Sequence, residues 1–166
     1  LNSIAVMDNG EIIMNGPNIK GNPLRISVGL LVLSYIIGEF VFPKYPLIYL
    51  INLFGIIGLI ISFGIFLAGF NIFKSYKENP NPSSASKVLI KTGVFAYTRN
   101  PIYLSFIIFF ISMFLLFENV AYILSAFGLS IWIHYWIIKL EEDYLQNLFS
   151  DEFVRYKRSV KRWLFF

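Results

Sequence analysis

Two short polar clusters flank a hydrophobic hairpin, and they hold the residues best suited to chemistry. The first cluster is Arg99-Asn100-Pro101-Ile102-Tyr103, and the second is Lys139-Leu140-Glu141-Glu142. Two uncharged segments, 101–117 and 119–138, lie between the clusters and are separated by Glu118. If both segments cross a membrane and a tight turn joins them, the two clusters meet at the same membrane face.

The two clusters combine an anion-binding group with carboxylates. The planar guanidinium of Arg99 can hold a carboxylate or phosphate, and free N–H groups at a helix start also favour an anion. Glu141 and Glu142 can hold a cation, or position an acceptor and take its proton. With aromatic neighbours such as Phe95 and Tyr103, this set suits a zwitterionic, amphiphilic ligand. The alternative is a structural role, in which the basic side chains reach lipid headgroups and the glutamates pair with them.

The composition indicates a membrane protein. Hydrophobic residues make up 57% of the chain and charged residues only 14%, whereas a soluble domain is about a quarter charged. Basic residues lie between apolar segments rather than along one stripe, so we expect no nucleic-acid partner. The absence of cysteine excludes disulfides, thiolate metal sites and a catalytic thiol.

The hydrophobic pattern predicts an all-α, polytopic membrane protein with about four transmembrane helices. These are expected at about 26–42, 47–73, 101–117 and 119–138, within a membrane domain of residues 26–166 whose tail is 139–166. In that tail, apolar residues recur every three or four positions from Leu145 to Trp163, which predicts one or two amphipathic helices with a break near Ser150. Residues 1–25 form a polar N-terminal segment, either a small hairpin around Asp8-Asn9-Gly10 or a flexible tail.

The distribution of basic residues predicts the orientation. With these four spans, Lys44 alone lies on one side, and the other 13 of the 14 lysines and arginines lie on the opposite side. Since cytoplasmic segments carry the excess of lysine and arginine, both termini and both polar clusters are expected in the cytoplasm. In a bacterium this would be an inner-membrane protein.

Several motifs in residues 80–163, about half of the chain, resemble one enzyme family in order and spacing. They are Leu89-Ile90-Lys91-Thr92-Gly93-Val94-Phe95, Tyr97-Thr98-Arg99-Asn100-Pro101-Ile102-Tyr103, Glu141-Glu142, and the tail residues Leu145, Phe149, Phe153 and Tyr156. The chain thus resembles integral-membrane methyltransferases of the isoprenylcysteine carboxyl methyltransferase and phospholipid methyltransferase group. The resemblance implies an enzyme that uses S-adenosylmethionine as methyl donor and a small or lipid-like acceptor beside the lipid bilayer.

The resemblance also implies which residues serve which ligand. The donor-binding residues would be Lys87, Val88, Leu89, Ile90, Phe95, Asn100, Pro101, Ile102 and Tyr103. Catalysis would involve Arg99, Glu141 and Glu142, and acceptor binding would involve Lys139 and Glu142. His134 shares a helical face with Glu141 and Glu142, so it either lines the acceptor pocket or is a hydrogen-bonded interior histidine.

The chain departs from the family pattern in ways that leave the acceptor open. Asn100 stands where well-known members have histidine, so a titrating imidazole is absent there. Phe95 replaces tyrosine, Lys87 replaces histidine, and Ser150 replaces glycine. These changes affect acceptor identity more than donor binding, much of which runs through the backbone in the family.

Two other classes of protein remain as alternatives. A membrane reductase of related architecture would use NADPH instead of a methyl donor. A small transporter or scaffold would instead depend on Glu39, an intramembrane carboxylate near the end of the first span. No spacing motif supports a metal site.

Overall fold

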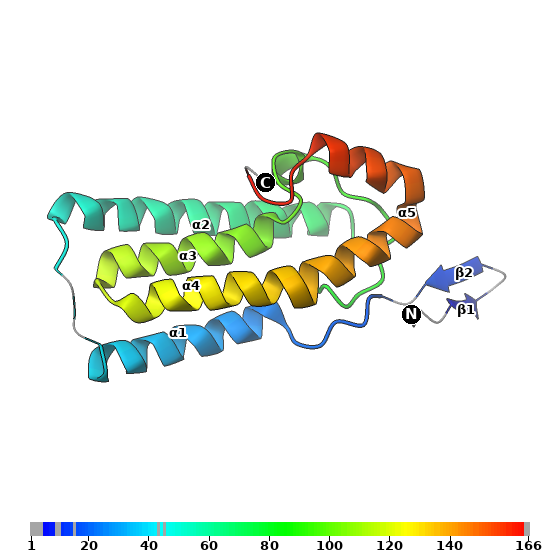
Figure 1. Ribbon diagram of the computed structural model, residues 1–166. Coiled ribbons are helices and arrows are strands. Elements are labelled where there is room, and N and C mark those ends of the chain that lie inside the picture. The colour runs from blue at the N-terminus through cyan, green and yellow to red at the C-terminus, as the bar shows by residue number, and fades with distance from the viewer. Residues whose placement is uncertain (1–4, 9–10, 15, 43, 45, 165–166) are drawn as a thin grey trace.

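The computed structural model describes residues 5–8, 11–14, 16–42, 44 and 46–164, and side chains from residue 16 onward. Four apolar helices form a bundle, α1 (Pro23–Phe40), α2 (Tyr49–Ser75), α3 (Pro101–Phe117) and α4 (Val120–Ile133). A π-helical turn, η2 (His134–Ile138), joins α4 to α5 (Lys139–Ser159), which bends back over one end of the bundle (Figure 1). A short 3₁₀ turn, η1 (Gly93–Ala96), precedes α3.

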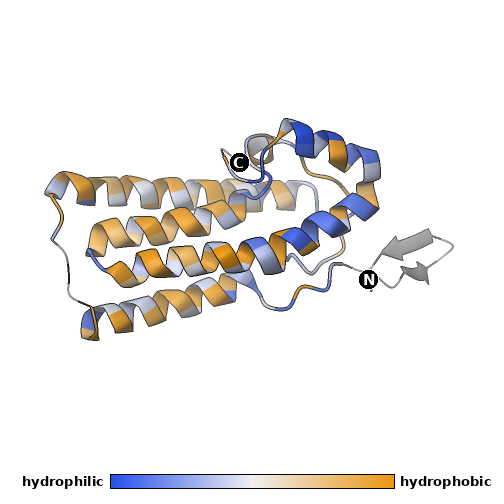
Figure 2. Cartoon of the chain, viewed as in Figure 1, coloured by the Kyte–Doolittle hydropathy of each residue, from blue (hydrophilic) through white to orange (hydrophobic). Residues whose placement is uncertain are grey.

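The apolar helices confirm the predicted polytopic, all-α membrane domain. Three helical segments are long and apolar enough to span a bilayer, namely α1, α2 and the continuous helix that begins with α4. At about 1.5 Å per residue, the 17 residues of α3 cover about 26 Å, which is close to the hydrocarbon thickness. Apolar colour covers the bundle, whereas α5 and the adjoining loops are hydrophilic (Figure 2). The apolar part of the α4 segment ends at Ile138, so we take α5 to lie beyond the membrane.

The observed helix ends differ little from the predicted ones. The α1 helix begins at Pro23 because the Asn22 side chain accepts hydrogen bonds from the backbone of Leu24 and Arg25. In the turn between α3 and α4, Glu118 adopts a left-handed backbone conformation. The connection at 43–46, between the first two predicted spans, lies partly outside the described residues.

The bundle is held by close helix contacts. Helices α2 and α3 pack along their length, with edge-to-face contact between Phe63 and Phe109. A Cβ at Gly58 would lie 2.2 Å from the Ser112 hydroxyl, so glycine permits this close approach. On the other side, α1 packs on α4 through a 2.7 Å hydrogen bond between the hydroxyls of Ser34 and Ser125.

The N-terminal segment contains the predicted hairpin, although its turn residues 9 and 10 lie outside the described residues. Strands β1 (Ala5–Asp8) and β2 (Glu11–Met14) pair antiparallel, with Ala5 opposite Met14. Ile19 is buried against the helical core. The division between a segment 1–25 and a domain 26–166 stays a prediction, but α1 begins three residues before that boundary.

Helix α5 has the predicted amphipathic character and the predicted break. Ser150 has non-helical dihedral angles, which kink the helix. Its apolar side packs against the loop before α3. Leu89, Phe153, Tyr156 and Val160 form a buried cluster there, separate from the main core of the bundle. This packing brings the tail of the chain against the first polar cluster.

Candidate active site

The first polar cluster and the residues just before it form a short segment that leads into α3 and is partly buried. Gly93, at the start of η1, has a positive φ of 58°, a conformation that favours glycine. Thr98 and Asn100 are buried, and Pro101 then begins α3 as predicted. Asn100 occupies the N-cap position of α3, but its side chain makes no capping hydrogen bond, and its amide N–H donates instead to the carbonyl oxygen of Arg162 at 3.0 Å.

The second polar cluster lies at the start of α5. Glu142 is buried, Glu141 is partly buried, and Lys139 is exposed. The Tyr103 hydroxyl of α3 donates to Glu141 at 3.0 Å, which ties the two clusters together. The π-helical turn just before α5 changes the helical register between His134 and these glutamates; such turns occur frequently at functional sites.

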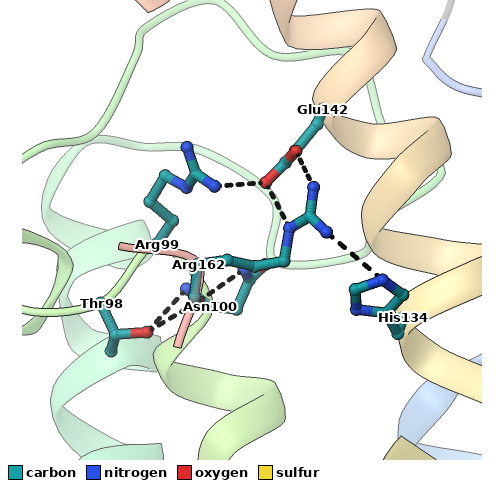
Figure 3. Close-up of polar contacts among 6 residues, drawn as sticks. All are labelled: Thr98, Arg99, Asn100, His134, Glu142 and Arg162. Carbon is teal, nitrogen blue, oxygen red and sulfur yellow. Dashed lines mark hydrogen bonds and ion pairs between the residues drawn. The ribbon is translucent and has the colours of Figure 1, made fainter. Parts of the chain in front are cut away.

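Glu142 is the centre of an ion-pair network (Figure 3). Arg99 Nη2 lies 2.9 Å from Glu142 Oε1, and both side chains are about nine-tenths buried. Arg162 donates from Nε to Oε1 at 3.0 Å and from Nη2 to Oε2, which makes a bidentate pair with the same carboxylate. Arg162 Nη1 also lies 3.3 Å from His134 Nε2. The predicted meeting of Arg99 with the glutamates is therefore confirmed.

The electrostatics differ among these groups. Burial lowers the pKa of the Arg99 guanidinium, and the nearby Glu142 carboxylate opposes this shift. Hydrogen bonding to Glu142 raises the pKa of Arg162. Burial raises the pKa of the Glu141 carboxyl to about 7, against the opposing effect of the Tyr103 hydrogen bond. Glu141 thus exchanges a proton near neutrality, whereas two guanidinium groups hold the Glu142 carboxylate.

One pocket gathers most of the predicted site residues, including members of both clusters. The predicted residues that line it are Val88, Leu89, Ile90, Phe95, Arg99, Asn100, Glu141 and Glu142. Phe73, Phe153, Tyr156 and the loop around Pro80 complete its wall. Arg99 Nε is buried and has no hydrogen-bond partner within the described part of the chain. The wall of the pocket therefore contains a buried, unused donor beside apolar and acidic side chains.

The remaining predicted site residues lie around this pocket and do not line it. Lys87 contributes a backbone N–H to Glu78 at 2.9 Å. Ile102 and Tyr103 border a neighbouring cavity beside residues 79–82, and Pro101 is buried at the α3 start. Lys139 lies over the ring of Tyr135, 4.5 Å from its centroid. The predicted roles of these residues stay predictions.

His134 lies on the other side of the ion-pair network. It lines an apolar groove with Leu104, Ile131 and Trp163. Its contact with Arg162 agrees with the interpretation as a hydrogen-bonded histidine, while the groove keeps an acceptor-binding role open. In the described part of the chain, no three histidine, aspartate or glutamate residues are grouped as a metal site would require.

The sequence reasoning missed three residues that order the site. Arg162 is one of several basic residues in the tail, yet its carbonyl accepts from Thr98 and Asn100 and its side chain binds Glu142. Thr98 donates its hydroxyl to the Arg162 carbonyl at 3.0 Å. Tyr156 donates from its hydroxyl to the Phe95 carbonyl at 2.6 Å. The apolar stripe of the tail could have indicated packing of Tyr156, but no local pattern identifies Arg162.

Comparison with known families identifies the class of this membrane protein. The model of the phospholipid methyltransferase family matches residues 50–152. The chain belongs to the phospholipid methyltransferase family. Comparison with curated proteins gives no match. The matched region includes nearly all of α2, all of α3 and α4, and the pocket residues Arg99, Glu141 and Glu142, which supports a membrane methyltransferase over a reductase or a transporter.

Proposed function

We propose that this membrane methyltransferase takes its methyl group from S-adenosylmethionine and passes it to a small or lipid-like acceptor at the cytoplasmic membrane face. The observation that carries this proposal is the composition of one pocket. It combines a buried guanidinium that has an unused donor with two carboxylates and an aromatic wall.

The residues of the pocket fit the chemical groups of the donor. Arg99 would hold the donor carboxylate, because its free Nε–H is a charged donor that costs free energy when left unsatisfied. Leu89, Ile90 and Phe95 would contact the nucleoside of the donor. The sulfonium of S-adenosylmethionine supplies an activated methyl group.

The chain's own contribution is mainly alignment. Holding two reactants in line for transfer contributes about 7–11 kcal/mol in favourable cases. Glu142, fixed by two arginines, is suited to position groups. Glu141, with a pKa of about 7, is suited to take a proton from the acceptor.

The location of the pocket supports the proposed orientation and access. The start of α1, the loop between α2 and α3, and α5 lie at the same end of the bundle (Figure 1). These segments carry the basic residues that the positive-inside rule assigns to the cytoplasm. The donor would enter from the cytoplasm, and a lipid-like acceptor would approach from the bilayer.

Binding to purified protein in lipid nanodiscs tests the donor assignment. Calorimetry with S-adenosylmethionine should give saturable binding, whereas NADPH should give none. Replacing Arg99 with lysine (Arg99→Lys) should weaken binding about 10- to 100-fold, the effect of losing a charged hydrogen bond. Arg158→Lys is the matched control, because Arg158 is an exposed arginine outside the pocket.

Transfer itself is measured with methyl-labelled donor and an extract of membrane lipids and small amphiphiles. Label should appear in an acceptor only with active protein, and partition into organic solvent would distinguish a lipid from a soluble acceptor. A protein that binds no donor, or one in which Arg99→Lys changes nothing, would contradict the assignment.

A further inference from the structure

Arg162 and Arg99 compete for the same carboxylate. Arg162 uses both Nε and Nη2, and so occupies both oxygens of Glu142. Arg99 reaches only Oε1, through Nη2. A carboxylate can pair with an arginine fork through two parallel hydrogen bonds, and here Arg162 makes that bidentate pair.

The consequence for Arg99 is an unused donor. Its Nε–H is buried and unpaired within the described residues, although the guanidinium lies against Glu142. If Oε2 were free, the Nε–H and Nη2–H groups of Arg99 could form the same side-on fork that Arg162 forms now. The unpaired Nε–H would then be satisfied inside the protein instead of by a ligand.

Backbone hydrogen bonds hold residues 161 and 162 in place without using the Arg162 side chain. The Arg162 carbonyl accepts from Thr98 and Asn100, each at 3.0 Å. The Lys161 carbonyl accepts from the backbone N–H of Arg99, also at 3.0 Å. Trp163 packs against the main helical core. These contacts do not use the Arg162 side chain, so its replacement leaves them in place.

We propose that Arg162 is a positioning residue that saturates Glu142 and thereby keeps the Arg99 Nε–H available for the donor carboxylate. This role rests on the proposed function, since it assumes that Arg99 meets that carboxylate. Arg162 acts through Glu142 and Arg99, and it does not line the donor pocket. Its effect is on recognition of one anionic group.

The test compares two ligands that differ by one group. S-adenosylmethionine and its decarboxylated form are titrated calorimetrically against wild type and Arg162→Gln in nanodiscs. In the variant, affinity for S-adenosylmethionine should fall about 10- to 100-fold, as for loss of one charged hydrogen bond. Affinity for the decarboxylated form should stay within about twofold. Arg158→Gln, at an exposed arginine of α5, should change neither.

Two further measurements separate positioning from folding. Arg162→Lys keeps the charge but lacks the fork, so it should show the same selective loss in a smaller degree. Added guanidinium ion should restore affinity for S-adenosylmethionine in Arg162→Ala and leave binding of the decarboxylated ligand unchanged. Equal loss for both ligands, or no loss for either, would overturn the role of Arg162. Failure of wild type to bind S-adenosylmethionine would overturn the proposed function instead.

Discussion

The protein has two carboxylate–cation pairs of equal length at opposite ends of its bundle. Glu39 and Lys44 lie 2.9 Å apart at one end, and Glu142 and Arg99 lie 2.9 Å apart at the other. The side chains of the first pair are 34% and 55% exposed at the surface of the bundle, whereas those of the second are 9% and 10% exposed. The second carboxylate also binds Arg162.

This difference in burial gives the two pairs different meanings. An exposed pair gains little, because water and ions screen it. A buried pair has lost its hydration, so removing one partner leaves a charge that nothing else compensates. The distance within an ion pair therefore does not identify a functional site. Several charged groups that meet in a buried region do indicate one, and they are found at the end of the bundle that carries the pocket.

The largest effect is expected from Glu142→Gln. Removing the carboxylate leaves Arg99 and Arg162 close together and uncompensated, which should cost about 3–5 kcal/mol of stability. Thermal and denaturant unfolding in detergent micelles measure this loss, and the methyl-transfer assay should show loss of turnover. An unfolding free energy within about 1 kcal/mol of wild type would break the contrast between the two ends.

A smaller effect concerns the pH dependence of Glu141. Because burial raises the pKa of this carboxyl to about 7, we expect turnover to rise as pH increases through about 7. Glu141→Gln should remove that ionisation from the pH profile. Asp143→Asn, at an exposed carboxylate on the same helix, is the matched control and should leave the profile unchanged.

The contribution of Glu141 to folding stability has the opposite pH dependence to turnover, because it falls as pH rises. A carboxyl whose pKa is higher in the folded state binds its proton more tightly there, so its stabilising contribution is complete below about 4.5 and is lost as pH rises through about 7.

The Tyr103 hydrogen bond lowers the pKa of Glu141, so in Tyr103→Phe the pH dependence of turnover should move to higher pH. A turnover profile that shifts to lower pH would contradict this account.

Local sequence patterns predicted much of the fold. Long apolar segments predicted the membrane helices, because a segment in the bilayer core must satisfy its backbone N–H and C=O groups with internal hydrogen bonds. Pro101 correctly marked the start of α3, and the serine at position 150 marked the kink in α5. The nearly equal lengths of the two hairpin segments, 17 and 20 residues, correctly predicted that Arg99 lies near Glu142.

The parts that the sequence did not reveal depend on contacts between distant residues. Arg162 follows α5 among several basic residues, and only the return of the tail onto residues 98–100 distinguishes it from an exposed anchor. The Asn100 side chain, at the N-cap position of α3, makes no capping hydrogen bond and donates its amide N–H to the tail instead. The π-helical turn has no signal in the apolar pattern of residues 134–138.

The smallest effect is expected at the opposite end of the bundle. Glu39→Gln removes the exposed pair with Lys44, which should change stability by about 0–1 kcal/mol. Donor binding and methyl transfer should match wild type, since Glu39 does not line the pocket. Adding salt should reduce even this small difference, because salt screens exposed charges. A Glu39→Gln variant that folds normally but loses turnover would make both ends of the bundle functional.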